Sequence, residues 1–469
     1  MPLQSCMKTA LLCLLVSLST GCAVTSVFKP YPNQAEEYKA AIGSEMMSGD
    51  VTVPEATLQD LSEDRDSADA MLYIMERGRI AQLHNKFEAS REDYQFVIDR
   101  FEEQDLAATL DASEAGAQTA SLLTNDNAIP YKGAGYERIF VHHQQALNYW
   151  ANGDLEGASV EFRKVALEQQ VLEEKFEAEI AEAEEEAQEK EIEIDSVSDQ
   201  FAGLSTVAGE VKSSFQNAYT FYHSAAFWEA IGELNNALVD YKKTLEINPE
   251  STLVKQDVAR LSKKLSMNVD SEDINSAAED EGVVVILFED GFIPAKTETR
   301  ITLPNFSDGG LVSVAFPYYD TSTWPKSTHL SVIDDLFTDY GNTYPLVDFG
   351  ALAVKDLKEQ VPKMIVRQVL RAVAKNELQK QSGDHLGLAG QLVANIYNIV
   401  SESADRRSWL TIPHTGQALR INVKEGAREL TLRANNVSKK LKLDVKADTT
   451  TFVRVVHVNN TLIAQTFKL

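Results

Sequence analysis

Three carboxylates and two adjacent histidines are the side chains of this chain that could do acid–base chemistry. Glu137, Glu289 and Asp290 could meet in space, and carboxylates converging on one cleft are what glycoside hydrolysis requires. His142 and His143 are neighbours in a predicted helix, so their side chains point to different sides. The chain contains no phosphate loop, no Gly-x-Ser-x-Gly and no His-Glu-x-x-His. We therefore expect a protein that is not an enzyme, with carboxylate catalysis as the alternative.

A metal or cofactor site is not indicated. Asp334, Asp335 and Asp339 suggest calcium ligands, but the Gly and the terminal Glu of a calcium loop are missing. The chain has three cysteines, and all of them lie within the first 22 residues. A chain cleaved before Cys22 would therefore have no further thiol for a disulfide or a zinc site. We expect no metal and no cofactor.

The start of the chain has the features of a targeting segment in the expected order. Lys8 precedes an apolar run from Ala10 to Leu18, and Ser19-Thr20-Gly21-Cys22 follows. This pattern resembles a bacterial lipoprotein signal. The resemblance implies that residues 1–22 are a signal peptide, with Met7 as an alternative start, and that Cys22 carries lipid such as palmitate. An ordinary secretory signal cut nearby is the alternative.

The residue after Cys22 bears on where the protein is sorted. Ala23 stands there, and the enterobacterial rule uses Asp at this place to retain lipoproteins in the inner membrane. We expect an outer-membrane protein that faces the periplasm. The apolar run is shorter than the roughly 20 residues that a membrane span needs. A formal charge of −27 disfavours nucleic acid and bare anionic bilayers as partners, so the lipid is the expected membrane contact.

Helical periodicity with small residues at contact positions indicates antiparallel helix pairs between residues 66 and 268, after a tether and short helix over 23–65. In the segment from Ile139 to Glu168, Ala146 and Ala158 are small where two helices must touch, and Phe162 follows four residues later. This resembles a tetratricopeptide repeat. A cleaner copy at 218–250 and a degenerate copy at 71–104 keep the same register.

The resemblance to tetratricopeptide arrays implies a concave groove lined by the first helix of each pair. Trp and Arg are frequent binding hot spots, so such a groove suits an extended peptide or helix of a protein partner. Packing between the helices is the alternative role for Trp150 and Tyr219. The positions that match the groove are Arg79, Gln82, His143, Trp150 and Tyr219.

The insertion between the second and third copies carries a Glu-rich run from Glu168 to Asp195, and the hairpin predicted there covers about 168–230. Two apolar stripes flank a polar break from Asp195 to Asp199, which predicts a long antiparallel helical hairpin. One long acidic helix is the alternative. The first stripe is Leu172, Phe176, Ile180, Ala183 and Ala187, and the second is Leu204, Ala208, Val211, Phe215, Ala218, Tyr222 and Ala225.

The period changes after an acidic linker at 269–281. The apolar run from Val283 to Phe288 fits a strand buried on both faces, and Asn459-Asn460 fits a hairpin turn. We therefore expect residues 282–469 to form a β-sandwich-like domain with a helical insertion at about 345–403. Together with the helical half, this predicts an α+β fold for the chain. The other predicted strands are 299–303, 311–316, 409–412, 419–423, 430–432, 441–445, 451–458 and 461–467.

The chain as a whole resembles an uncharacterised family of bacterial lipoproteins with a tetratricopeptide-like half and a β-rich C-terminal half. Genes of this family tend to lie beside one for a lipoprotein similar to the activator of a penicillin-binding protein, which points to the cell envelope. We expect a periplasmic protein-binding scaffold, with a peptidoglycan-binding or peptidoglycan-modifying module as the alternative. The residues that carry the resemblance are Asn127-Ala128, Tyr131, Gly133, Tyr136-Glu137-Arg138, Ala146–Tyr149, Gly153-Asp154, Gly157-Ala158, Leu287–Gly291 and Ala404–Trp409.

Overall fold

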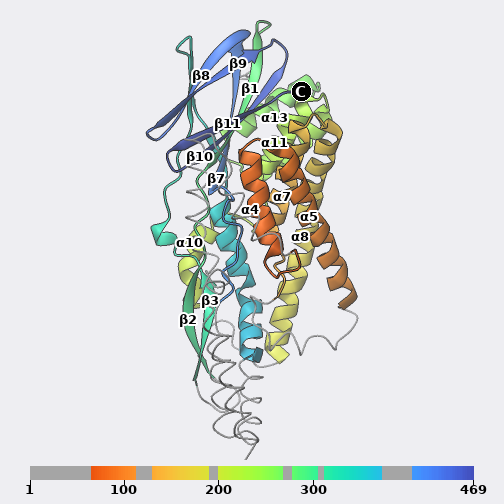
Figure 1. Ribbon diagram of the computed structural model, residues 1–469, viewed down its shortest axis with the longest axis vertical. Coiled ribbons are helices and arrows are strands. Elements are labelled where there is room, and N and C mark those ends of the chain that lie inside the picture. The colour runs from red at the N-terminus through yellow and green to blue at the C-terminus, as the bar shows by residue number, and fades with distance from the viewer. Residues whose placement is uncertain (1–64, 112–128, 190–198, 268–276, 305–310, 372–403) are drawn as a thin grey trace, which may run out of the picture.

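The computed structural model of the protein describes residues 65–111, 129–189, 199–267, 277–304, 311–371 and 404–469, and all structural statements concern these residues. The predicted signal peptide with Cys22, nearly all of the tether and most of the acidic linker lie outside them. The N-terminal half is helical, and the strands lie in the C-terminal half (Figure 1). The predicted α+β class is therefore confirmed.

The described part of the N-terminal half consists mainly of three helix pairs and a following single helix, with two short helical segments before the third pair (Figure 1). The pairs coincide with the three predicted copies, and each turn contains a residue with positive φ, namely Asn85 (62°), Gly153 (80°) and Gly232 (89°). In chain order the helices are α4 (Ala70–Leu83) with α5 (Phe87–Asp111), α7 (Gly135–Ala151) with α8 (Leu155–Glu189), α11 (Ala218–Ala230) with α12 (Leu234–Ile247), and α13 (Thr252–Lys264).

Small residues allow α7 and α8 to approach closely. Ala146 and Ala158 are both fully buried, as the sequence pattern predicts. A Cβ atom added to Gly157 would lie 2.5 Å from Cδ1 of Tyr149, which is closer than real side chains come. The central hairpin therefore requires glycine at this contact.

The predicted Glu-rich hairpin is correct in its first half and wrong in its second. α8 continues the second helix pair for 35 residues to Glu189, as predicted. After residues 190–198, however, the chain forms only the 3-10 helix η3 (Asp199–Leu204) and the short helix α10 (Ser205–Ala208), and helical structure resumes at α11. The second apolar stripe is thus not one face of one helix.

The residues of that second stripe are buried against several different elements. Phe215 packs against Ile139 of α7 and Val165 of α8, whereas Leu204 and Ala208 join the main core. Gly209 ends the short helix, and serines follow at 213 and 214, so local propensity disfavours a continuous helix here. Burial alone explains the apolar spacing.

Eleven strands are present in the described part of the C-terminal half. They form a five-stranded sheet in the order β11-β10-β1-β7-β6, a four-stranded sheet in the order β5-β4-β8-β9, and a β2-β3 hairpin. The bounds are β1 (Glu281–Asp290), β2 (Thr297–Pro304), β3 (Leu311–Tyr318), β4 (Ser331–Asp334), β5 (Asp339–Asn342), β6 (Tyr344–Asp348), β7 (Thr415–Lys424), β8 (Gly426–Ala434), β9 (Val437–Val445), β10 (Thr450–Val458) and β11 (Thr461–Phe467).

β1 is the central strand of the five-stranded sheet and is buried on both faces, as predicted. It pairs in parallel with β10 and antiparallel with β7. Because side chains alternate along a strand, Val284 and Ile286 enter the core shared with the four-stranded sheet, whereas Val285 and Leu287 enter the core shared with the helices. The fold therefore has three layers, with helices on one face of the five-stranded sheet and the four-stranded sheet on the other, and the two sheets form a β-sandwich.

The helical insertion begins a few residues after its predicted start at about 345, because β6 covers that start, and an ion pair joins it to α8. A helix covers residues 349–371, and Nζ of Lys363 on it lies 2.8 Å from Oε2 of Glu179. Residues 372–403 lie outside the described part. Phe349 shares one hydrophobic core with helix residues such as Tyr219 and strand residues such as Leu287. The helical and β-rich halves are thus joined by a continuous core.

The predicted strand at 409–412 is wrong. Trp409 to Ile412 form a buried turn whose backbone N–H groups at 409 and 410 donate to Glu137 and Glu76 of the helices instead of to a neighbouring strand. The other predicted strands are present, and Asn459 has the positive φ of 54° expected at the β10–β11 turn. The short strands β4, β5 and β6 were not predicted.

Candidate functional site

The five residues of the predicted partner groove lie together, but the groove is filled by the same chain. Each of the five is at most 2% exposed. Their neighbours include the five-stranded sheet, because the ring of Trp150 packs against Phe452 of β10, and Trp150 Nε1 donates to the carbonyl oxygen of Lys468, directly after β11, at 3.0 Å. The prediction of an open groove for a separate protein is therefore wrong, because the sheet covers this surface of the helices. The residues concerned are Arg79, Gln82, His143, Trp150 and Tyr219.

A buried carboxylate, Glu289, lies at the centre of this contact. It follows Val285 and Leu287 on the face of β1 that looks toward the helices. Arg454 of β10 approaches it with Nε 2.9 Å from Oε1 and Nη2 3.1 Å from Oε2. Arg79 of α4 pairs with Oε2 of the same carboxylate. Two guanidinium groups from different layers therefore share one carboxylate, and all three side chains are essentially unexposed.

Neutral amides and a phenol complete the network around this ion cluster. Oε1 of Gln144 accepts from Arg79 at 2.9 Å and from Arg454 at 2.8 Å. Oε1 of Gln82 accepts from Arg454 at 2.7 Å, and the Tyr219 hydroxyl donates to Glu289 at 3.2 Å. The amide oxygens partly offset the excess positive charge of two arginines on one glutamate. We call Arg79, Gln82, Gln144, Tyr219, Glu289 and Arg454 the interlayer network.

A pair of buried histidines adjoins the interlayer network. Nε2 of His143 lies 2.8 Å from Nδ1 of His223 on α11, and both rings are at most 1% exposed. Burial lowers the pKa of His223 to about 3. Burial also lowers the pKa of His143 well below its usual value, and His223 and Arg79 act in the same direction. His142 instead faces Glu161 at 2.7 Å, so the two adjacent histidines point to different sides, as predicted.

The three candidate catalytic carboxylates do not share a cleft. Glu137 accepts from the Trp409 backbone N–H at 2.7 Å and from the Tyr131 hydroxyl at 2.5 Å. Asp290 accepts from the Thr328 N–H at 2.6 Å and contacts Nδ1 of His457 at 2.7 Å. Glu289 belongs to the interlayer network. Each carboxylate is buried and has its own hydrogen-bond partners, as is typical of carboxylates that stabilise a fold.

The aspartates considered for calcium also have structural partners. The Asp334 carboxylate accepts from the N–H groups of Leu336 and Thr338 at 2.9 and 2.7 Å and from the Tyr340 hydroxyl at 2.9 Å. Among the described residues, no group of three or more His, Cys, Asp or Glu side chains is placed to hold a metal ion. Nor does any described helix have the length and apolar character to cross a membrane.

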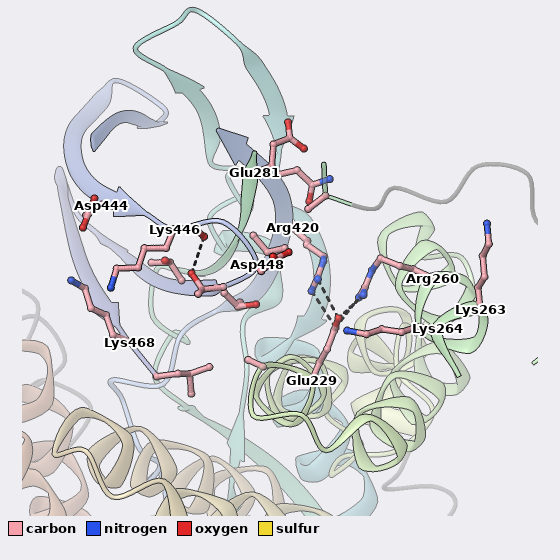
Figure 2. A pocket seen from close by; sticks show the side chains of 18 residues that line it. Glu229, Arg260, Lys263, Lys264, Glu281, Arg420, Asp444, Lys446, Asp448 and Lys468 are labelled. Atoms are coloured by element: carbon pink, nitrogen blue, oxygen red, sulfur yellow. Dashed lines mark hydrogen bonds and ion pairs between the residues drawn. The ribbon is translucent and has the colours of Figure 1, made fainter. Parts of the chain in front are cut away.

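An open pocket of about 630 Å³ lies between the helices and the β-rich half (Figure 2). α11 and α13 form one wall, and β1, β7 and the β9–β10 turn form the other. Among the residues that the structure describes, no aromatic side chain lines it. Ten of its lining side chains are charged, namely Glu229, Arg260, Lys263, Lys264, Glu281, Arg420, Asp444, Lys446, Asp448 and Lys468.

An ion cluster links the two walls of the pocket. Arg260 of α13 and Arg420 of β7 both bind the Glu229 carboxylate, with Nη2 of Arg260 2.7 Å from Oε2 (Figure 2). Burial alone would raise the pKa of Glu229, but the two guanidinium groups outweigh burial and lower it to about 2. Asp257 adds a second carboxylate 2.9 Å from Arg260. The cluster is therefore a balanced set of two cations and two anions that joins helices to sheet.

Comparison of the chain with protein-family models, with curated proteins and with solved structures finds no match in any of the three.

Sequence reasoning missed Arg454, and it named Glu289 only as a candidate catalytic carboxylate and not as the partner of the predicted groove residues. Arg454 interrupts the apolar strand β10, and Glu289 follows the longest apolar run of the C-terminal half. A charge placed within a buried strand is a signal for an internal partner of opposite sign, because an unpaired buried charge is very costly. Which charges pair could not be inferred, since Arg79 and Glu289 are 210 residues apart.

Replacing Glu289 by Gln should strongly destabilise the fold. The change leaves two buried guanidinium groups without a countercharge, and breaking a buried pair in this way costs about 3–5 kcal/mol. Urea denaturation measures this loss in the free energy of unfolding. Adding Arg79→Met to Glu289→Gln restores the net charge of the network and should recover part of the loss. Glu281→Gln, at the less buried start of the same strand, should change stability by no more than about 0.5 kcal/mol.

Mild acid should destabilise the protein through the histidine pair. The unfolded chain protonates histidine below about pH 6.5, whereas the folded pair stays neutral to much lower pH, so the stabilisation is complete above pH 6.5 and is lost as pH falls. Each histidine should contribute a slope of about 1.4 kcal/mol per pH unit below its unfolded pKa. Urea denaturation from pH 8 to 5 should show a shallower slope for His223→Gln. An equal slope in wild type and His223→Gln would contradict a neutral buried pair; His329→Gln, an exposed site, serves as the control.

Proposed function

We propose that the protein is a lipid-anchored scaffold of the bacterial outer membrane that binds another envelope protein on the outside of its folded body. The charged pocket between α13 and the five-stranded sheet carries this proposal. The helical groove is occupied by the sheet, so a partner would contact other surfaces.

The chemistry of the pocket favours a protein segment over a small metabolite. Small-molecule sites are mostly apolar, with a few convergent polar groups. This pocket instead presents charges of both signs over a wide opening, with Lys446 and Lys468 on one side and Lys263 and Lys264 on the other (Figure 2). Polar, solvated contacts of this kind are common at the rims of protein interfaces.

Peptidoglycan is the second candidate, because its stem peptides also carry carboxylates and amines. The pocket matches the charges of such peptides. It offers no aromatic side chain on which a sugar ring could stack. We therefore favour the protein partner.

Charge reversal in the pocket tests the binding proposal. Lys446→Glu with Lys468→Glu changes two exposed side chains of the pocket, so the fold should persist while cross-linked periplasmic partners are lost. Lys242→Glu with Lys255→Glu applies the same charge change to exposed positions outside the pocket and should leave the partners in place. Chemical cross-linking in intact cells followed by mass spectrometry measures both. An unaltered partner set in the pocket variant, or retention on purified peptidoglycan sacculi that the same variant abolishes, would contradict the protein-partner proposal.

The anchoring proposal rests on the lipobox-like run that ends at Cys22. Cys22→Ser removes the sulfur that would be acylated, so the protein should shift from the membrane to the soluble periplasm or stay unprocessed. Membrane fractionation and the mass of the mature N-terminus measure this. Unchanged fractionation of Cys22→Ser would contradict the lipid anchor, and Ser19→Ala, which keeps the cysteine, should remain membrane-bound.

A further inference from the structure

The turn between β4 and β5 exposes two large apolar side chains side by side. Phe337 is 90% exposed, and Leu336 is 53% exposed. Phe337 also has a φ of 60°, in the left-handed region that bulky side chains rarely adopt. Both features are unfavourable for an isolated protein, and they coincide at one residue.

The backbone of this turn is held firmly from within. The Phe337 N–H donates to the Asp334 carbonyl, and the Asp334 N–H donates to the Thr338 carbonyl, both at 3.1 Å. The buried Asp334 carboxylate binds the N–H groups of Leu336 and Thr338 and the hydroxyl of Tyr340. The turn therefore presents Leu336 and Phe337 in a fixed direction, which lowers the entropy lost on binding.

The fold itself gives no reason for phenylalanine at this position. Glycine is the residue most favourable at a turn position with positive φ, because it has no Cβ that would clash with the backbone. Phe337 makes the turn less favourable and leaves its own ring in water. Strain that the fold does not need is a sign of function.

The charges around the two apolar residues define the partner. Asp335 and Asp339 flank them, and both are exposed. We propose that this segment, Asp335–Asp339, is a docking tip that inserts Leu336 and Phe337 into an apolar pocket on another protein whose rim carries Lys or Arg. Charge complementarity disfavours an anionic bilayer, which would repel the two aspartates. This inference rests on the proposed scaffold function and names a recognition element for it.

Variants at the tip separate a docking role from a structural one. Phe337→Gly should raise the melting temperature or leave it unchanged, because glycine suits the positive φ, and yet it should abolish partner capture. Asp335→Lys should weaken capture by reversing a flanking charge. Val239→Ser removes another exposed apolar side chain, 52% exposed on α12, and should leave capture intact. A fall in melting temperature for Phe337→Gly with capture unchanged would overturn the proposal.

Site-specific photo-cross-linking identifies what the tip touches. A benzophenone amino acid in place of the exposed Thr338, in the full-length protein in cells, should capture a protein at an apolar segment flanked by Lys or Arg, as located by mass spectrometry. Capture of a second copy of this chain, or at a segment without these features, would overturn the proposal. So would binding of the purified protein to vesicles of phosphatidylglycerol and phosphatidylethanolamine that Phe337→Gly abolishes.

Failure of the tip and failure of the scaffold function give different results. If chemical cross-linking elsewhere on the protein recovers partners that Phe337→Gly does not lose, the tip proposal fails and the scaffold proposal stands. If no protein partner is recovered by either method, both proposals fail.

Discussion

The ion cluster of Glu289 with Arg79 and Arg454 is the interaction on which the arrangement of layers depends. Each of these charges is fully desolvated, and each would be very costly alone. The carboxylate belongs to β1, one guanidinium to β10 and the other to α4, so the charges are compensated only when helices and sheet are docked in one register. A helical half without its sheet would expose Arg79 and the apolar residues around it. The network thus favours one packing of the layers over alternatives, whatever its net contribution to stability.

Because the sheet is docked on them, the helix pairs have a different structural role from those of an open array. In an open array, the inner face of the first helices is a surface for other molecules, but here it is the wall of a core. Trp150 shows the change, since its ring packs 4.6 Å from that of Phe452 on β10 and its N–H donates to the carbonyl of Lys468. The proposed partner would therefore bind the outer surface of the protein, because the inner face of the helices is covered by the sheet. Aromatic and Arg residues at groove positions therefore do not by themselves indicate a binding groove; they also suit a face that receives a second domain.

Local patterns were sufficient to predict most elements, and long-range pairing limited the rest. Helical spacing and small residues located the three helix pairs, and the apolar run from Val283 predicted the doubly buried strand. The turn at Trp409 was misassigned because an apolar run suggests a strand, whereas its N–H groups bind Glu76 and Glu137, more than 270 residues away in sequence. The apolar residues from Leu204 to Phe215 have helical spacing although they do not form one helix, because they are buried against different elements. The site residues Arg79, Gln82 and Tyr219 were found, but their partner was the chain itself.

The pocket and the tip, the two surfaces proposed to bind a partner, differ in their chemistry. The pocket offers exposed charges of both signs, which interact weakly through water and are sensitive to salt. The tip offers Leu336 and Phe337, whose burial in a partner would release water from a large apolar area. Binding energy at protein interfaces is concentrated in such buried anchors, whereas rim charges mainly guide association and orientation. If both surfaces meet one partner, we infer that the tip sets its rate of dissociation and the pocket its rate of association, because only the tip contact removes a large apolar surface from water.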